Sequence, residues 1–288
     1  SRYRAAMQWL PGARIEPRER RILAWGSAAL FLAGWADVSV KNVSETLFLK
    51  RIGVELLPLA FLANAFLLMG TTSLLGLVAS RVDPVRLFTR ALAGLGVLLG
   101  MLWVLVHVGG AASYPILLIA SKQISAIALI SFSVATSVLV DPRQAKQLLP
   151  PLLAGGTLGS ILGSFASGPL GKVLDVEGLL PLAGLLLLLG AAATLPLRRL
   201  PAARVVLERR TSAAARAAPA QTEPSVRALW AENWLFRALV HSAILCGAVG
   251  PMLYFQFSYV ADLATRGQGG EEKLLSLYGQ LRGWLQLA

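Results

Sequence analysis

A few charged and amide side chains lie inside otherwise apolar stretches, and their chemistry needs an explanation. Lys122 lies near the start of the apolar stretch 114–140, with Gln123 beside it and no acidic residue within a helical turn. An unpaired ammonium in hydrocarbon costs at least about 2.5 kcal/mol. Lys122 should therefore face a water-filled cavity or an anion from a ligand or another helix, unless its side chain reaches the outer interface.

A second polar group lies at the end of the first apolar stretch. Asp37, Lys41, Ser44 and Glu45 have the i, i+4, i+7, i+8 spacing that partly places side chains on one helix face. They could line the mouth of a cavity or only solvate a helix end. Lysines are strong partners for phosphate or carboxylate, and amides can orient such a group or join two helices. The candidate substrate-binding residues are Lys41, Asn42, Ser44, Glu45, Asn64, Lys122, Gln123 and Gln256.

Several kinds of chemistry are not expected. The single cysteine, Cys246, allows neither an internal disulfide nor a thiolate metal cluster, and His107 and His241 are isolated from each other and from other ligand residues. The chain has no Gly-rich Walker loop, so ATP hydrolysis is not expected to supply energy. Neither a Ser/His/Asp grouping nor paired carboxylates lie near the spans, which argues against a membrane-embedded enzyme. We expect no cofactor, no metal and no enzymatic activity.

The elements that must position these side chains are long apolar helices. Hydrophobic residues make up 56% of the chain and charged residues 15%, and the mean hydropathy is +0.64. A helix of about 20 apolar residues crosses the hydrocarbon core of a bilayer. The sequence predicts spans at 22–40, 55–79, 87–108, 114–140, 148–171, 178–197 and 235–261. The segment from Leu274 to Ala288 is too short to cross. We expect the chain to end inside an eighth span and, since it starts at Ser1 without Met, to be a fragment.

The distribution of basic residues predicts the orientation of the chain. Lys and Arg gather in the tail before residue 22, the loop 80–90, the turn at 143–146 and the segment 198–233. The opposite ends hold fewer, namely Lys41, Lys50, Arg51, Lys172, Arg266 and Lys273. Basic loops stay on the cytoplasmic side, so the N-terminus should be cytoplasmic. The net charge of +12 is then explained by contact with anionic membrane lipid, and nucleic-acid binding is not expected.

The fold class expected is all-α, a polytopic transmembrane helix bundle. Its parts are a basic tail at 1–21, a six-helix bundle at 22–197, a basic cytoplasmic linker at 198–233 and the start of a second set of helices at 234–288. Six helices, a long basic linker and further helices resemble the layout of major facilitator transporters. In that layout the substrate site lies near the midplane between the two halves.

Small residues recur at every fourth position of one predicted span. A helix brings positions i and i+4 to the same face, so a stripe of this kind lets another backbone approach closely. The stripe could serve helix packing alone, or it could be a smooth seam along which helices slide. Its members are Gly155, Gly159, Gly163, Ser167 and Gly171.

Two short loops on the predicted cytoplasmic side carry charges that could form a gate. The loop after the second span lies where major facilitator proteins carry a charged gating loop, and the loop after the fourth span is its symmetry-related counterpart. Contacts between them would break on inward opening; the alternative is ordinary helix ends under the positive-inside rule. The residues concerned are Arg81, Asp83, Arg86, Asp141, Arg143 and Lys146.

Three stretches resemble a transporter family. Residues 141–148, DPRQAKQL, followed by 153–163, LAGGTLGSILG, are similar to the ATP/ADP translocase-type nucleotide transporters. Weaker likeness lies in 45–53, ETLFLKRIG, which leads into Leu57-Pro58, and in 254–257, YFQF, with Tyr278-Gly279 downstream. The resemblance implies a multi-pass exchanger of nucleotides or another organic anion by alternating access, in a bacterial inner membrane.

The resemblance also implies site residues in spans one, four and seven. By position these are Lys41 and Ser44, the neighbourhood of Ser121 and Lys122, and Gln256. The family pattern has a second lysine where this chain has Ser44 and a glutamate where it has Lys122. The alternative function is a non-transporting membrane anchor or sensor that derives from such a transporter and tethers soluble domains. The expected partners are membrane lipid and a small anionic solute such as a nucleotide, with the oligomeric state left open.

Overall fold

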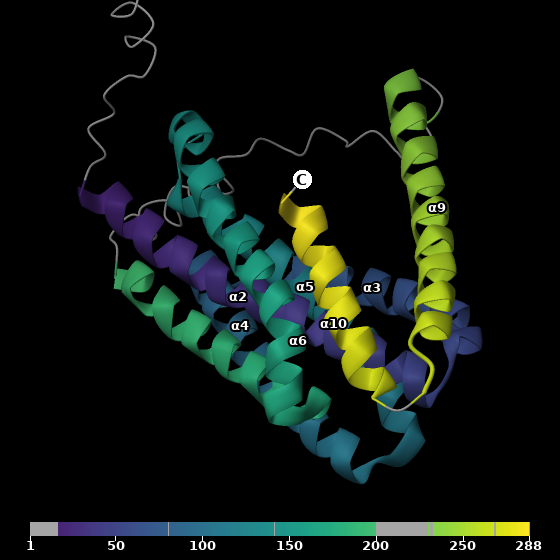
Figure 1. Ribbon diagram of the computed structural model, residues 1–288. Helices are drawn as coiled ribbons and strands as arrows, with labels where there is room; N and C mark the ends of the chain where they lie inside the picture. The colour runs from purple at the N-terminus through teal and green to yellow at the C-terminus, as the bar shows by residue number, and fades with distance from the viewer. Residues whose placement is uncertain are drawn as a thin grey trace, which may run out of the picture.

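The computed structural model describes residues 17–79, 81–140, 142–199, 230, 233–267 and 269–287, and these ranges consist of helices and the short turns between them. This confirms the predicted all-α class. The long helices are α2 (Pro17–Arg51), α3 (Leu57–Ala79), α4 (Pro84–Val108), α5 (Ser113–Leu139), α6 (Pro142–Thr194), α9 (Trp234–Ala264) and α10 (Gly270–Leu287) (Figure 1). Short 3₁₀ turns lie at Val54–Leu56, Gly110–Ala112 and Leu195–Arg199.

Five helical segments of the described residues are long and apolar enough to cross a membrane. They are Glu19–Arg51, Val54–Ala79, Pro84–Val108, Gly110–Leu139 and Ala145–Leu197. The last of these belongs to α6, in which Asp175 has φ 63° and ψ 161° and interrupts the helical geometry. The interruption falls between the predicted spans 148–171 and 178–197, so α6 contains two arms.

The first helix is longer than predicted at both ends. Its described part runs from Pro17, inside the segment expected to be a tail, and proline is well tolerated in the first turn of a helix, where its missing N–H leaves no bond unmade. It continues beyond residue 40 through the polar positions Lys41 to Glu45 and ends at Arg51. Those polar residues are therefore held by regular helix and do not belong to a loop.

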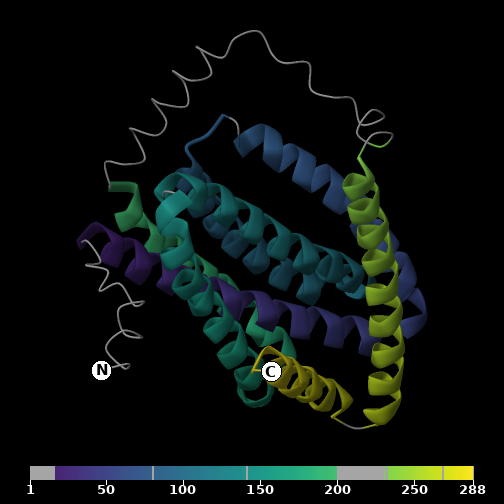
Figure 2. The ribbon, with the colours of Figure 1, turned by 90° about the horizontal axis from the view of Figure 1, so that it is seen from above.

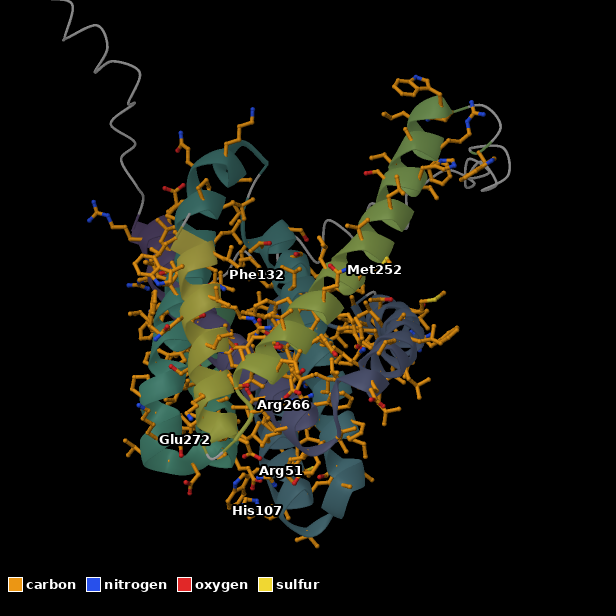
Figure 3. All side chains as sticks on the ribbon, turned by 45° about the vertical axis from the view of Figure 1, so that its right-hand side comes forward. Arg51, His107, Phe132, Met252, Arg266 and Glu272 are labelled. Carbon is orange, nitrogen blue, oxygen red and sulfur yellow. The ribbon has the colours of Figure 1, made fainter. Side chains whose placement is uncertain are left out.

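Short turns make successive helices antiparallel, and the bundle has two ends. At the Arg51 end, α2, α4 and α9 finish and α3, α5 and α10 begin. Figure 3 shows Arg51, His107, Arg266 and Glu272 gathered there. The opposite end, which we call the Arg21 end, carries the start of α2 and the turn 81–83 before α4. Asp83 caps α4 by accepting a hydrogen bond from the Arg86 backbone N–H at 3.0 Å.

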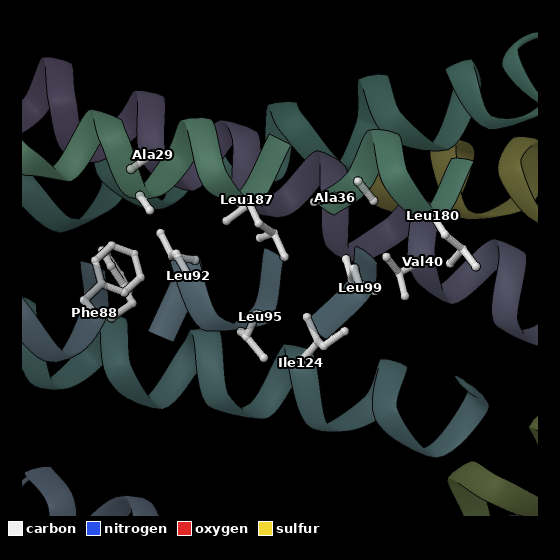
Figure 4. Packing of buried hydrophobic residues seen from close by; sticks show 14 of the residues in the cluster. Ala29, Ala36, Val40, Phe88, Leu92, Leu95, Leu99, Ile124, Leu180 and Leu187 are labelled. Atoms are coloured by element: carbon white, nitrogen blue, oxygen red, sulfur yellow. The ribbon is translucent and has the colours of Figure 1, made fainter. Parts of the chain in front are cut away.

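The core lies between α2, α4, α5 and both arms of α6. Figure 4 shows Leu92 and Leu99 of α4 facing Ala36 of α2 and Leu187 of α6. The small residues of α2 allow close approach, and the larger leucines of α4 and α6 fill the space between the helices. Between helices that cross a membrane, lipid tails are as apolar as leucine, so such side chains hold helices together by close van der Waals packing and not by their removal from water.

The stripe of small residues in α6 packs against two different helices. A Cβ at Gly155 would lie 2.7 Å from the Ser27 carbonyl oxygen of α2, and one at Gly159 would overlap the Phe31 carbonyl oxygen. Further along the helix, a Cβ at Gly171 would overlap Leu275 of α10. The stripe therefore brings α6 close to the backbone of α2 first and to the Leu275 side chain of α10 afterwards.

Helices α3 and α9 lie at the edge of the bundle. No residue in the apolar window of α3 is buried, and the buried residues of α9 in the described range are Ser258 and Ala261, both near its C-terminal end. Figures 1 and 2 show α9 joined to α10 at the Arg51 end and standing away from α2 and α6 toward its N-terminus. Apolar surface of this kind suits a lipid environment or further helices.

Candidate functional site

A buried carboxylate links three helices in the interior of the bundle. Glu45 of α2 is only 1% exposed. Its Oε1 accepts a hydrogen bond from Lys122 Nζ of α5 at 2.5 Å, and its Oε2 accepts one from Arg282 Nη2 of α10. A buried charge without a partner is costly, and each carboxylate oxygen here has one. We call Glu45, Lys122 and Arg282 the Glu45 cluster.

The second nitrogen of Arg282 extends the cluster to a fourth helix. Arg282 Nη1 donates to Asn42 Oδ1 at 2.5 Å, and Asn42 Nδ2 donates to Ser167 Oγ of α6 at 3.2 Å. Ser167 in turn donates to the Gly163 carbonyl oxygen at 2.7 Å. The guanidinium is therefore oriented from two sides, as its fork of donors allows.

Two tyrosine rings support the two cations. Lys122 Nζ lies 5.4 Å from the centre of the Tyr254 ring of α9, and the Arg282 guanidinium lies 5.3 Å from that of Tyr278. Both distances are within the range of cation–π attraction. The Tyr278 hydroxyl forms a 3.1 Å hydrogen bond with Ser258 Oγ, which joins α10 to α9 beside the cluster.

The cations keep accessible surface that the carboxylate lacks. The side chains of Lys122 and Arg282 are 22% and 19% exposed, against 1% for Glu45. The Lys122 ammonium has three hydrogen-bond donors, of which one is used in the bond described above. The Arg282 guanidinium has five, of which two are used. The cluster has two positive charges and one negative charge, so it can accept a further oxyanion from its exposed side.

A second ion pair lies near the Glu45 cluster. Lys41 Nζ is 2.7 Å from Asp37 Oδ2, and Ser125 of α5 donates to the other oxygen of Asp37. Ser44 Oγ donates to Ser121 Oγ at 2.9 Å. Lys41 is thus neutralised by its own helix, and the excess positive charge stays with Lys122 and Arg282.

A cavity of about 480 Å³ lies in the part of the bundle toward the Arg21 end, and Glu45, Lys122 and Arg282 are not among its lining residues. Its lining includes Asp37, two turns before Glu45 on α2, Ser125, about one turn after Lys122 on α5, and Gln286, about one turn after Arg282. The remaining lining is apolar or small and includes Leu30, Ala33, Gly34, Phe88, Ala128, Leu129, Phe132, Leu153, Gly156, Thr157 and Ser160. The cavity therefore combines an apolar wall with a few polar groups that lie one or two helical turns from the Glu45 cluster.

A different set of ion pairs joins the helices at the Arg51 end. Lys50 Nζ lies 2.8 Å from Asp262 Oδ1 of α9, and Arg51 lies 2.8 Å from Glu271 of α10 and 2.9 Å from Glu177 of α6. We call these five residues the Arg51 cluster. All of them except Asp262 line part of a cavity of about 830 Å³ at this end of the bundle, beside His107 and Glu272.

The structure brings most of the predicted substrate residues together, in pairs. Asn42 and Glu45 contact Arg282, Ser44 contacts Ser121, and Gln123 Nε2 donates to Asn64 Oδ1 at 2.9 Å. Lys122 has its anion from another helix, one of the two partners expected. Gln256 is exposed on α9 and is not among the described residues that contact the cluster.

The predicted gate stays a prediction. Asp141 and the side chain of Arg143 lie outside the described residues, so their contacts with the loop 81–86 are not described. Asp83 serves as the N-cap of α4. Arg81, Arg86 and Lys146 are exposed.

Sequence reasoning missed Arg282, Tyr254 and Tyr278 as members of the site. Arg282 lies in the segment taken for an incomplete span, yet an arginine within a transmembrane helix carries the same cost as Lys122 and was the available signal. The two tyrosines served only for the family resemblance. Among the described residues, no group of three or more His, Cys, Asp and Glu side chains could hold a metal ion.

Comparison with known proteins does not identify a family or a function for the chain. No protein-family model matches the chain, and neither a curated protein nor a solved structure matches it significantly.

Proposed function

We propose that this chain forms part of a membrane transporter that moves an organic anion by alternating access. The observation that carries the proposal is the Glu45 cluster, in which two partly exposed cations share one buried carboxylate inside a helix bundle. Charged residues at such a position face the bundle interior or a water-filled cavity and commonly mark a substrate pathway. The excess of positive charge sets the sign of the substrate.

The cavity beside the cluster fits a substrate with an organic body. Its volume of about 480 Å³ lies in the range of small-molecule sites, which are mostly apolar with a few polar groups that fix orientation. Phe88 and Phe132 supply aromatic surface in its wall. A small inorganic ion would leave most of this wall uncovered, so an anion attached to an apolar or flat group fits better.

The two ends of the bundle support access from one side at a time. At the Arg51 end, ion pairs join α2 to α6, α9 and α10 across the mouth of the cavity of about 830 Å³. The cavity near Asp37 lies toward the Arg21 end, where α9 stands away from the bundle and no such set of ion pairs lies among the described residues (Figure 1). Basic residues concentrate at the Arg21 end, which the positive-inside rule assigns to the cytoplasm. We infer an inward-facing arrangement in an inner membrane.

Nucleotides are the first substrates to test. The stretches 141–148 and 153–163 resemble the ATP/ADP translocase-type transporters, and a nucleotide combines a flat base with phosphate oxyanions. Ser44 and Lys122 depart from the family pattern, and Lys122 adds positive charge where that pattern has a carboxylate. The geometry therefore supports an organic anion, with nucleotide specificity as the narrower form of the proposal.

One observation favours a second function. Lys41, Lys122 and Arg282 each have a carboxylate partner within the chain, as a bundle without any substrate would require. Paired in this way, the charges could serve only to fix helix positions in a membrane anchor or sensor module.

Uptake by proteoliposomes separates the two functions. We would reconstitute the complete protein with ADP inside or with empty lumen, add labelled ATP outside, and compare it with Lys122→Ala and with Lys172→Ala. Lys172 is an exposed lysine of α6, so its variant controls for the loss of any positive charge. Uptake that needs internal ADP, persists in Lys172→Ala and fails in Lys122→Ala supports nucleotide exchange.

Other results would redirect the proposal. Uptake of ATP without internal ADP would support anion transport and remove obligatory exchange. Absence of uptake of ATP and of a panel of other labelled organic anions, in protein shown to be folded, would favour the anchor.

A further inference from the structure

Glu45 occupies the position that an anionic ligand of this site would take. One of its oxygens binds Lys122 and the other binds Arg282. The two cations are therefore spaced so that a single carboxylate bridges them. Phosphate and carboxylate groups present pairs of oxygens with similar geometry, so the same two cations can bridge either group.

We propose that Glu45 is an internal competitor of the transported anion, which binds when an oxyanion group of the ligand bridges Lys122 and Arg282 in its place. The inference rests on the proposed function, because it assumes that the Glu45 cluster binds the ligand. It adds the ligand's chemical class, a group with at least two oxygens that share negative charge. It also assigns to Glu45 the control of ligand affinity.

The side chains of the cluster differ in their freedom to exchange partners. Glu45 is enclosed, and its neighbours Ser44 and Thr46 on α2 are also fully buried. Lys122 and Arg282 carry their charges on long side chains that reach the cluster from α5 and α10 and keep exposed surface. The carboxylate is thus the fixed member, and the two cations are the members whose exposed surface lets them meet a ligand.

Competition of this kind lowers the apparent affinity for the ligand. The cations bind ligand fully only in the fraction of molecules in which Glu45 has released them, and the apparent dissociation constant rises as that fraction falls. The released carboxylate is buried and unpaired, which opposes a long stay of the ligand. A transported solute must leave on the other side, so a bound state that is weakened in this way suits transport.

The alternative role for Glu45 is to position Lys122 and Arg282 for the ligand. The two roles predict opposite effects of its removal. A competitor, once neutralised, frees both cations, and anion binding becomes tighter. A positioning residue, once neutralised, lets the cations move away, and anion binding becomes weaker.

The test measures binding of inorganic phosphate to the purified complete protein at constant ionic strength, with chloride as the balancing anion. Glu45→Gln should bind phosphate at least about tenfold more tightly than the unchanged protein, because interactions between close charges of this kind are worth several kcal/mol. Arg282→Gln leaves one cation neutralised by Glu45, so it should lose phosphate binding. Glu45→Gln added to Arg282→Gln should restore binding, because Lys122 is then free.

Phosphate-dependent stabilisation against heat gives a second readout, and Glu55→Gln is the control. Glu55 is an exposed glutamate between α2 and α3, and its variant should bind phosphate like the unchanged protein. Should Glu45→Gln alone fail to fold, the comparison of Arg282→Gln with the double variant decides the question. Weaker binding in the double variant than in Arg282→Gln, or in Glu45→Gln than in the unchanged protein, would overturn the competitor role.

Absence of phosphate binding by every variant would also overturn it. The labelled ATP uptake described above is a separate measurement, so the two proposals can fail independently. Tight phosphate binding by Glu45→Gln without any nucleotide uptake would support the competitor role of Glu45 and exclude nucleotides as the transported substrate. Uptake with the opposite order of phosphate affinities would keep the transporter and reject the competitor.

Discussion

Two clusters of ion pairs join α2 to α10, and they differ in burial and in charge. In the Glu45 cluster the carboxylate is 1% exposed, whereas in the Arg51 cluster the side chains of Arg51 and Glu271 are 37% and 33% exposed. The other pair of the Arg51 cluster, Lys50 with Asp262, is more enclosed, at 12% and 17%. Charges buried in the interior depend strongly on their partners, while exposed pairs contribute little to stability. We therefore expect Glu45 to keep its partners firmly and the contacts of Arg51 to break more easily.

The balance of charge also differs. In the Glu45 cluster two cations share one carboxylate, whereas at the Arg51 end Lys50, Arg51 and the exposed Arg266 face the three carboxylates of Asp262, Glu177 and Glu271. An anion would be attracted to the Glu45 cluster, which has an excess of positive charge, and not to the balanced charges at the Arg51 end. This difference agrees with an anion site in the interior and an end closure that a passing ligand does not occupy.

The largest effect should come from neutralising the buried carboxylate. Glu45→Gln leaves Lys122 and Arg282 without their anion, and breaking a buried pair in this way costs about 3–5 kcal/mol. In chloride buffer the variant should unfold at a clearly lower temperature than the unchanged protein, as measured by circular dichroism in detergent. An unfolding temperature equal to that of the unchanged protein would mean that Glu45 is no more important than an exposed partner, and the comparison between the clusters would lose its basis.

A packing change should have the next largest effect. Gly159→Ala places a methyl group against the Phe31 carbonyl oxygen of α2, where no space exists, and overpacking of this kind costs about 1–3 kcal/mol. The loss tests whether α2 is held by its contact with α6 as well as by its charges. Gly94→Ala in α4 is the matched control, because a Cβ there meets nothing within 4 Å and alanine favours helix. A loss in the control as large as in Gly159→Ala would contradict the packing argument.

The sequence was sufficient to predict the helices and the cost of the charges, but not the partners of the charges. Apolar runs of bilayer length and a four-residue repeat depend on local order, so the all-α class and the small-residue face of α6 could be derived from them. The contact between Glu45 and Lys122 joins residues 77 positions apart, and no local period encodes it. Arg282 was not predicted as a site residue because the segment from Leu274 to Ala288 was interpreted as an incomplete span.

The predicted spans 148–171 and 178–197 place a break inside α6, but the sequence does not indicate which residue adopts it. Asp175 adopts positive φ, which is uncommon for a residue with a side chain, and Gly178 close by was the residue better suited to such a conformation. Its position depends on how the two arms of α6 pack against α2 and α4. Tertiary contacts and not local preference therefore decide where the helix turns.

Replacement of this strained residue should stabilise the Arg51 end. The φ of 63° and ψ of 161° at Asp175 belong to a region that is essentially restricted to glycine, at a cost of order 1–3 kcal/mol. Asp175→Gly should therefore raise the free energy of unfolding by about 1 kcal/mol, after the greater chain entropy of glycine is allowed for. Asp83→Ala, which removes the cap of α4, should lower it and serves as the control. A destabilised Asp175→Gly would show that the carboxylate has a role in the cavity at this end.

Removal of the Arg51 side chain from the Arg51 cluster should have the smallest effect on stability and the clearest effect on conformation. Arg51→Gln removes the contacts with Glu271 and Glu177, and exposed pairs contribute about 1 kcal/mol or less, so the unfolding temperature should change little. The contacts still join α2 to α6 and α10, and their loss should allow this end to open. Spin labels at Glu55→Cys and Arg266→Cys, in a Cys246→Ala background, would report that opening as a longer-distance population.

Arg90→Gln, at the opposite end of α4, is the control and should leave the distance distribution unchanged, because Arg90 is exposed and remote from the Arg51 end. Identical distributions in Arg51→Gln and in the unchanged background would mean that packing between α2 and α10 keeps this end closed without the ion pairs. The Arg51 cluster would then not control access at this end of the bundle, contrary to what its exposure to solvent leads us to expect. An opened end with an unchanged unfolding temperature would instead show that a contact of little value to stability can decide which face of the bundle is accessible.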